Sequence, residues 1–135
     1  MGDAYNKYAL TLAVGDRVSR VVDFILTSYQ PDFAVLQGRA LIGIVIRDDV
    51  LKALANIPGN TLVTEIMERE FLKVEAAKSL DEVRRTMAEQ GKRIAAVYDG
   101  ANYLGLVSLE DIAEALAVQT FVERQKQLRR SQANA

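Results

Sequence analysis

Ser108 and Asp111 are the residues whose types and spacing could do chemistry. They lie in the segment Gly105-Leu-Val-Ser-Leu-Glu-Asp111, where a strand-like apolar run gives way to a helical pattern. A helix N-terminus offers free backbone N–H groups and a positive dipole end to a phosphate. A carboxylate beside it can accept hydrogen bonds from both hydroxyls of a ribose. The spacing is therefore compatible with a nucleotide-type ligand.

The same spacing is also that of a helix cap. A serine followed three residues later by an acid is a capping motif, and taken alone the segment is more typical of a cap than of a ligand site. The two roles are compatible, because Ser108 can cap the helix and touch a ligand through different lone pairs.

An earlier segment repeats this pattern. Gly43-Ile-Val-Ile-Arg-Asp-Asp49-Val-Leu-Lys-Ala-Leu54 reappears as Gly105-Leu-Val-Ser-Leu-Glu-Asp111-Ile-Ala-Glu-Ala-Leu116, 62 residues later and without a gap. A repeat of this length points to two copies of one supersecondary unit. Two such units need each other to bury their apolar faces, and the groove between them is the natural ligand site.

The first copy carries less of this chemistry. Ile46 stands where the second copy has Ser108, so the hydroxyl is missing, whereas the acid is kept as Asp49. Arg47 follows and could meet a phosphate, although an exposed arginine there is more typical of an ordinary surface residue.

The hydrophobic pattern around both motifs predicts a β-α-β-β-α unit that occurs twice. In the first unit we expect strands at 8–14, 33–36 and 41–46, a helix capped by Asp16, and a helix over 48–56 with Val50, Leu51 and Leu54 inward. After a break at 57–60 and a short linking helix at 61–68, the second unit has strands at 71–74, 94–98 and 103–107. Its first helix starts at a Ser79–Glu82 capping box, and its last runs from Ser108 to about Arg130.

The expected domain organisation is one module made of two repeats. The first spans residues 8–57, the second spans 61–118, and 119–135 form a helical tail. The cations of the tail suit the C-terminal end of a helix dipole. A nucleic-acid partner is not expected, because the tail lacks interleaved aromatics and the net charge of the chain is −1.

The composition argues against an enzyme. The chain has no histidine and no cysteine, which removes thiolate chemistry, the commonest general base and the commonest metal ligand. We expect no catalytic residues and no metal site. No apolar stretch is long enough to span a bilayer and no signal-peptide pattern is present, so a cytoplasmic location is expected for this chain or for a larger protein that contains it.

The pattern Gly-x-Val-Ser-x-x-Asp-Ile at the end of a β-α-β-β-α unit, found in tandem, resembles the cystathionine β-synthase (CBS) domain pair, or Bateman module. The likeness covers roughly residues 8–118 and is better in the second copy, from Leu80-Asp-Glu-Val83 through Tyr103–Leu116. It implies an α/β (α+β) fold of two CBS repeats packed about a pseudo-twofold axis. An ACT-type βαββα fold is the alternative, but it does not explain the Gly-x-x-Ser-x-x-Asp context.

The resemblance implies a regulatory ligand and no obligatory cofactor. The ligands typical of the family are AMP, ADP, ATP and S-adenosylmethionine. Carried over by position, Asp111 would bind the ribose, Ser108 would place ribose or phosphate, and Arg93 would face phosphate. Asp49 would be the ribose acid of the other cleft, which we expect to be weak or empty because of Ile46.

Three further positions bear on these clefts. Ala34 and Ala96 stand where proline is common in the family. Asp32 falls close to the expected adenine edge of the Asp111 cleft.

A narrower resemblance concerns Ser28–Leu36 and Gly43–Leu54. These segments are similar to the CBS pair at the C-terminal end of site-2-protease-like membrane zinc metalloproteases. The implied function is a non-catalytic module that senses an adenine nucleotide or adenosyl ligand and controls an attached membrane protease. The alternative is a structural or dimerisation module with no small-molecule ligand. A homodimer is expected through apolar helix positions, namely Val50, Leu51, Ile112 and Leu116.

Overall fold

The computed structural model describes residue 5 and residues 9–133, and it contains two units of equal topology. The first comprises β1 (Thr11–Ala13), α1 (Val18–Thr27), β2 (Asp32–Gln37), β3 (Ala40–Ile46) and α2 (Arg47–Ala53). The second comprises β4 (Leu72–Glu75), α3 (Leu80–Glu89), β5 (Ile94–Asp99), β6 (Asn102–Ser108) and α4 (Leu109–Ala133). In each sheet the first strand pairs parallel and the third antiparallel to the middle strand.

The repeat found in the sequence is confirmed in the strand register. Gly43 lies opposite Val35 in the first sheet, and Gly105 lies opposite Val97 in the second. Both hairpins turn at a glycine of positive φ, Gly38 at 61° and Gly100 at 60°, a conformation that glycine adopts without a steric penalty. The mixed α/β fold of two equivalent units is therefore as predicted.

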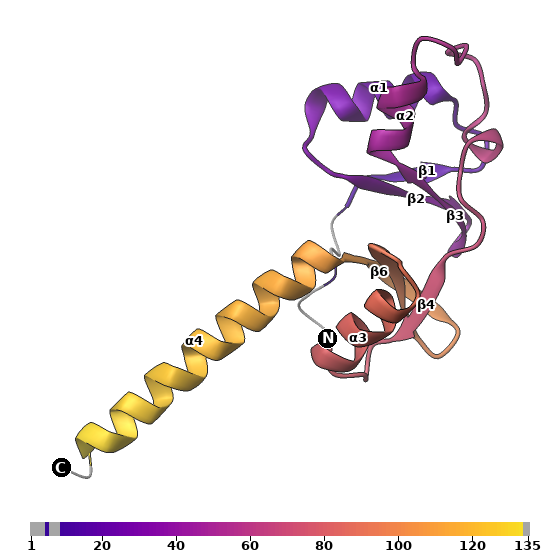
Figure 1. Cartoon of the computed structure of the whole chain (residues 1–135). Helices are drawn as coiled ribbons and strands as arrows, with labels where there is room; N and C mark the ends of the chain where they lie inside the picture. The colour runs from indigo at the N-terminus through magenta and orange to yellow at the C-terminus, as the bar shows by residue number, and fades with distance from the viewer. Residues whose placement is uncertain (1–4, 6–8, 134–135) are drawn as a thin grey trace.

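The sheets of the two units face each other, with α1 and α2 outside one and α3 outside the other (Figure 1). Each unit has its own apolar core between sheet and helices. A third cluster joins the sheets and centres on Ala34, Leu41 and Ala96, with Phe71 and Leu106 packed against it. The space between the sheets is thus partly core and partly cleft.

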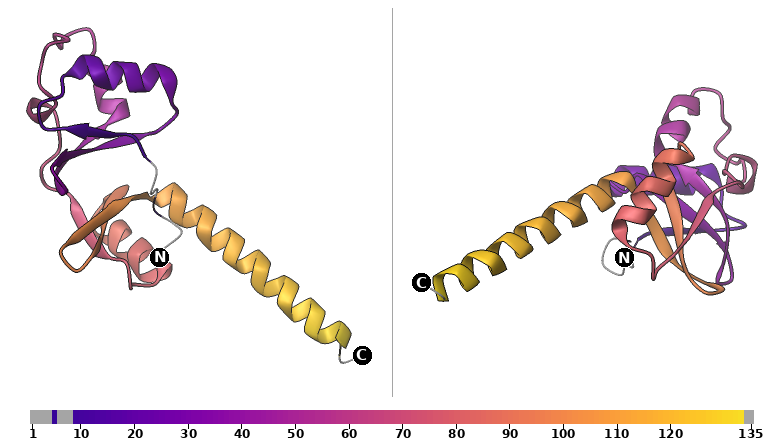
Figure 2. Two further views of the ribbon diagram at one scale, coloured as in Figure 1. Left: turned by 180° about the vertical axis from the view of Figure 1, so that it is seen from behind. Right: turned by 60° about the horizontal axis from the view of Figure 1, so that its bottom comes forward.

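Helix α4 leaves the body of the molecule as a single long helix, which Figure 2 shows from two further sides. Ile112 is fully buried in the second core and Leu116 packs against that core. From residue 117 to residue 133 every position is exposed. Among the helices of the described residues, none has the length and apolar character that crossing a bilayer requires.

Several local expectations were wrong. The N-cap of α1 is Arg17, and it makes no side-chain cap. Asp16 instead accepts a hydrogen bond from the Ala13 N–H (2.7 Å) and lies 3.5 Å from Arg20, so it closes the turn before the helix. The linker contains only a 3₁₀ turn, η1 (Val63–Glu65), in place of a helix over 61–68.

The predicted apolar face of α2 is also wrong in part. The helix ends at Ala53, and only Val50 is buried, whereas Leu51 and Leu54 are 45% and 38% exposed. A helix of only two turns can pack few of its side chains against the sheet, which leaves these two leucines partly exposed. Val50 and Ile112 belong to the cores of their own units, so neither is available for the dimer contact that the sequence suggested.

Candidate functional site

Ser108 and Asp111 form a reciprocal cap at the start of α4. The Asp111 N–H donates to Ser108 Oγ, and the Ser108 N–H donates to Asp111 Oδ2, each at 3.0 Å. Ser108 ends β6 and is 8% exposed, whereas Asp111 is half-buried. The capping interpretation is therefore confirmed. The cap fixes the direction of the Asp111 carboxylate at the mouth of the space between the sheets.

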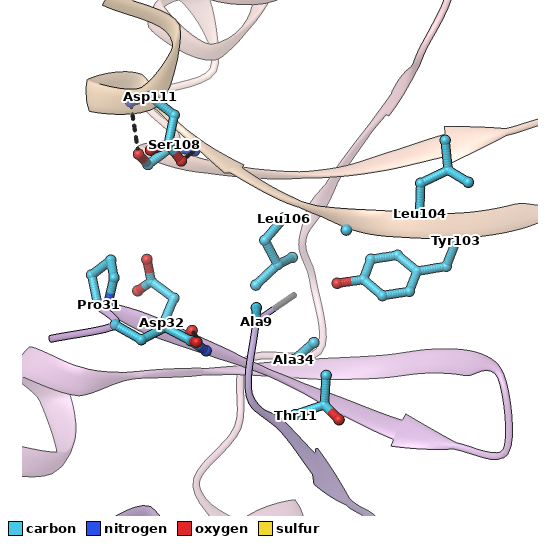
Figure 3. A pocket seen from close by; sticks show the side chains of 12 residues that line it. Ala9, Thr11, Pro31, Asp32, Ala34, Tyr103, Leu104, Leu106, Ser108 and Asp111 are labelled. Atoms are coloured by element: carbon cyan, nitrogen blue, oxygen red, sulfur yellow. Dashed lines mark hydrogen bonds between the residues drawn. The ribbon is translucent and has the colours of Figure 1, made fainter. Parts of the chain in front are cut away.

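This cap lies at one end of a cleft that both units line, which we call the Asp111 cleft. The cleft has a volume of about 150 Å³. Its lining from the first unit is Ala9, Thr11, Gln30, Pro31, Asp32 and Ala34, and from the second unit it is Tyr103, Leu104, Gly105, Leu106, Ser108 and Asp111. Figure 3 shows Leu106 and Ala34 in the middle of the cleft, between the acidic end and the hydroxyl of Tyr103. The arrangement suits a ligand with a flat apolar part and a polar end.

Asp32 faces the cap across the cleft, from the first residue of β2 (Figure 3). Burial raises the pKa of Asp32 to about 6; the carboxylates of Glu110, Asp48 and Asp111 add to the rise, and the Arg93 guanidinium opposes it. The sequence placed Asp32 near this cleft, and the structure brings it there.

Tyr103 is a lining residue that the sequence analysis missed. Burial raises the pKa of its phenol well above the usual value, and the neighbouring Tyr98 contributes. The hydroxyl therefore stays protonated and points into the Asp111 cleft (Figure 3).

A second cleft, which we call the Arg93 cleft, lies on the other side of Asp32 and has a volume of about 240 Å³. Pro31 and Asp32 line both clefts. The other lining residues of the Arg93 cleft are Ile44, Ile46, Asp48, Glu68, Glu70, Phe71, Gly91, Lys92, Arg93 and Ile94. The repeat offset of 62 relates it to the Asp111 cleft, since Ile46 takes the place of Ser108 and Phe71 takes the place of Ala9.

The remaining candidate residues lie apart from the Asp111 cap. Arg93 lines the Arg93 cleft, and its Nη2 lies 3.4 Å from Glu110 Oε1. Arg47 Nη1 donates to the Ser28 carbonyl oxygen at 2.9 Å, so this guanidinium braces the loop before β2. Asp49 is exposed and lines neither cleft. Among the described residues, no group of three or more carboxylates is placed to hold a metal ion.

Comparison with known proteins agrees with the two-unit architecture. Residues 63–118 match the family model of the CBS domain. A protein of Burkholderia ambifaria described as a signal-transduction protein with CBS domains has a similar structure, with a TM-score of 0.71, 26% identity, and coverage of 82% of this chain and 83% of that chain. The family model and the structural likeness together support a pair of CBS domains.

Two further relatives widen the comparison. The CBS domain of a bacterial CNNM/CorC family Mg²⁺ transporter, solved in complex with ATP, has a TM-score of 0.74 at 14% identity, with coverage of 83% of this chain and 82% of that chain. The A-adding tRNA nucleotidyltransferase of Geobacter sulfurreducens is 27% identical over 111 residues. That match covers 82% of this chain but only 12% of the transferase. The shared part is therefore a small section of a much longer protein.

Proposed function

We propose that this chain is a non-catalytic regulatory module that binds an adenosine-containing ligand in the Asp111 cleft. One observation carries the proposal: both units line the cleft, and at its end Asp111 stands on a rigid cap beside Ser108. A ligand there touches both units and can bias their relative orientation. It can do so only if it binds the two arrangements with different affinity.

The ATP complex of the Mg²⁺-transporter CBS domain supports this proposal, because in that protein a domain of similar fold binds an adenine nucleotide. Asp111 Oδ2 is used by the cap, and a carboxylate has further acceptor sites for ribose hydroxyls. The test is titration calorimetry of the unmutated chain with adenosine, AMP, ADP, ATP and S-adenosylmethionine. Binding that Asp111→Asn weakens and Asp49→Asn leaves intact supports the proposal. No heat with any of the five compounds contradicts it.

The second candidate function is a structural module without a small-molecule ligand. The reciprocal cap favours it, because Ser108 and Asp111 then have a complete role in starting α4. The melting temperature distinguishes the two functions: an adenosine compound should raise it if the chain is a binding module and leave it unchanged if the chain is purely structural.

The proposed setting is the cytoplasmic side of a membrane metalloprotease, in the same chain or associated with it. The likeness of Ser28–Leu54 to protease-associated CBS pairs supports this setting. The test joins the module to such a protease and measures cleavage with and without the ligand found by calorimetry. Equal rates at saturation contradict gating.

A homodimer belongs to the same proposal. Because Val50 and Ile112 are buried, the exposed Leu51 of α2 is the better candidate for the contact. Light scattering at tens of micromolar should show a dimer, and Leu51→Glu should shift it toward monomer. A monomer in the unmutated chain contradicts the proposal.

A further inference from the structure

The charged side chains that line the Asp111 cleft are of one sign. Its described lining includes two carboxylates, Asp32 and Asp111, and neither lysine nor arginine. The other polar side chains of the lining are uncharged: the amide of Gln30 and the hydroxyls of Thr11, Ser108 and Tyr103. An anionic phosphate in this space would meet like charges, whereas an uncharged or cationic group would not.

The nearest cation is used elsewhere. Arg93 contributes its charge to the field at Asp32, but its guanidinium pairs with Glu110 at 3.4 Å and lines the Arg93 cleft. Glu110 also lies close enough to act on Asp32. Arg93 has the larger effect of the two on Asp32, and Glu110, Asp48 and Asp111 oppose it. Because no lysine or arginine lines the Asp111 cleft itself, Arg93 offsets only part of the negative charge there.

The position of Asp32 makes this charge hard for a ligand to avoid. Asp32 rises from the sheet of the first unit, and Ser108 and Asp111 lie opposite on the second (Figure 3). A ligand whose ribose reaches Asp111 passes between two carboxylates. Repulsion in a partly desolvated cleft is stronger than in bulk water, since the effective dielectric constant is lower.

We propose that the Asp111 cleft selects an adenosine-type ligand without a phosphate, either neutral or positively charged, and that Asp32 sets this preference. This inference rests on the proposed function, and it narrows the ligand from adenine nucleotides to phosphate-free adenosyl compounds. Asp111 provides acceptors for the ribose hydroxyls, and Asp32 disfavours an anionic substituent on the same ligand.

The experiment is titration calorimetry with four probes: 5′-methylthioadenosine, S-adenosylmethionine, AMP and ATP. The first two should bind at least tenfold more tightly than AMP, and ATP should bind more weakly still. Asp32→Asn should reduce the ratio of 5′-methylthioadenosine to AMP affinity by about tenfold. Glu70→Gln is the matched control, because it removes a carboxylate that lines only the Arg93 cleft and is not among the groups that shift the pKa of Asp32, and it should leave the ratio unchanged.

Each contrary result has a distinct meaning. AMP or ATP binding as tightly as 5′-methylthioadenosine overturns this inference and leaves the proposed function standing. No binding of any probe overturns both. An unchanged ratio in Asp32→Asn overturns the assignment to Asp32. The dependence on salt is a test that needs no substitution. Raising the ionic strength from about 50 to about 500 mM should lower the ratio of 5′-methylthioadenosine to AMP affinity, because salt screens the repulsion of the phosphate. A ratio that does not change with salt also overturns the inference.

Discussion

The Asp111 cleft and the Arg93 cleft are made from equivalent segments of two equivalent units, yet they differ in the residues that decide what can enter. At three paired positions, the Asp111 cleft has a small or polar residue where the Arg93 cleft has a larger apolar one: Ala9 and Phe71, Asp32 and Ile94, Ser108 and Ile46. The backbone repeat is preserved, whereas the lining is not. In this molecule the fold therefore fixes where the clefts lie, and a few residue differences give their linings different chemistry.

The largest effect is expected from exchanging the residues that differ most in size. Ala9→Phe should place a ring in the Asp111 cleft and lower the affinity for adenosine compounds at least a hundredfold, roughly 3 kcal/mol. Phe71→Ala is the matched change in the Arg93 cleft and should leave that affinity unchanged. Calorimetry on both variants gives the answer. Unaltered binding in Ala9→Phe would mean that the ligand lies elsewhere.

The next effect concerns the two equivalent acids. Asp111→Ala should lower affinity tenfold to a hundredfold, because charge-assisted hydrogen bonds to the ribose are each worth about 1.5–3 kcal/mol. Asp49→Ala should have much less effect, since Asp49 is exposed and lines neither cleft. Titrations of the two variants compare them directly, and equal losses would show that both units bind ligand.

A third prediction uses the acid that the clefts share. The folded protein binds the Asp32 proton with a pKa of about 6, above the ordinary value of 3.8, so Asp32 costs stability as pH rises from about 4 to about 6. Asp32→Asn should therefore be more stable than the unmutated chain at pH 7.5, by at most about 3 kcal/mol, and this advantage should disappear near pH 4.

Urea unfolding at the two pH values measures this difference. The charged neighbours of Asp32 are Arg93, Glu110, Asp48 and Asp111, and they are the same in both proteins. The difference between the unfolding free energies of the two proteins therefore contains little contribution from the titration of these four neighbours. A difference that is independent of pH would show that the pKa of Asp32 is not raised.

The smallest effect concerns the cap. Ser108→Ala should lower the free energy of unfolding by about 1 kcal/mol and the ligand affinity about fivefold. Ser79→Ala is the control, because the Ser79 hydroxyl also caps a helix, accepting from the Glu82 N–H at 3.2 Å at the start of α3, but lines neither cleft. It should cost similar stability and no affinity. If Ser108→Ala also left affinity unchanged, Ser108 would be a cap alone.

Features governed by local sequence could be predicted. The offset of 62 identifies β3 and β6 as equivalent strands from the residues alone, because a repeated pattern implies a repeated unit. The caps at Ser79 and Ser108 were also predicted, since a cap joins residues three apart and needs no knowledge of the rest of the chain. At Ser79 the structure shows the serine half of the expected capping box, while the Glu82 carboxylate pairs with Lys78.

Features that depend on how the units pack could not be predicted from the sequence. Leu51 and Leu54 have the spacing of a buried face, but α2 is too short to cover its sheet with them. The offset of 62 pairs Ala9 with Phe71 in the sequence. That these two residues line equivalent clefts, however, is seen only when the chain before each sheet is packed against the sheet of the other unit.

The long exposed part of α4 has a mechanical consequence. Residues 117–133 extend about 24 Å beyond the body, and the helix starts at the Ser108–Asp111 cap, which lines the Asp111 cleft. A rigid rod converts a small rotation at its base into a larger displacement at its tip. A tilt of about 10° at the cap moves the far end by roughly 4 Å, which is more than two residues of helical rise. A partner that contacted only the tip of α4 would therefore respond to a rotation of the cap without touching the cleft.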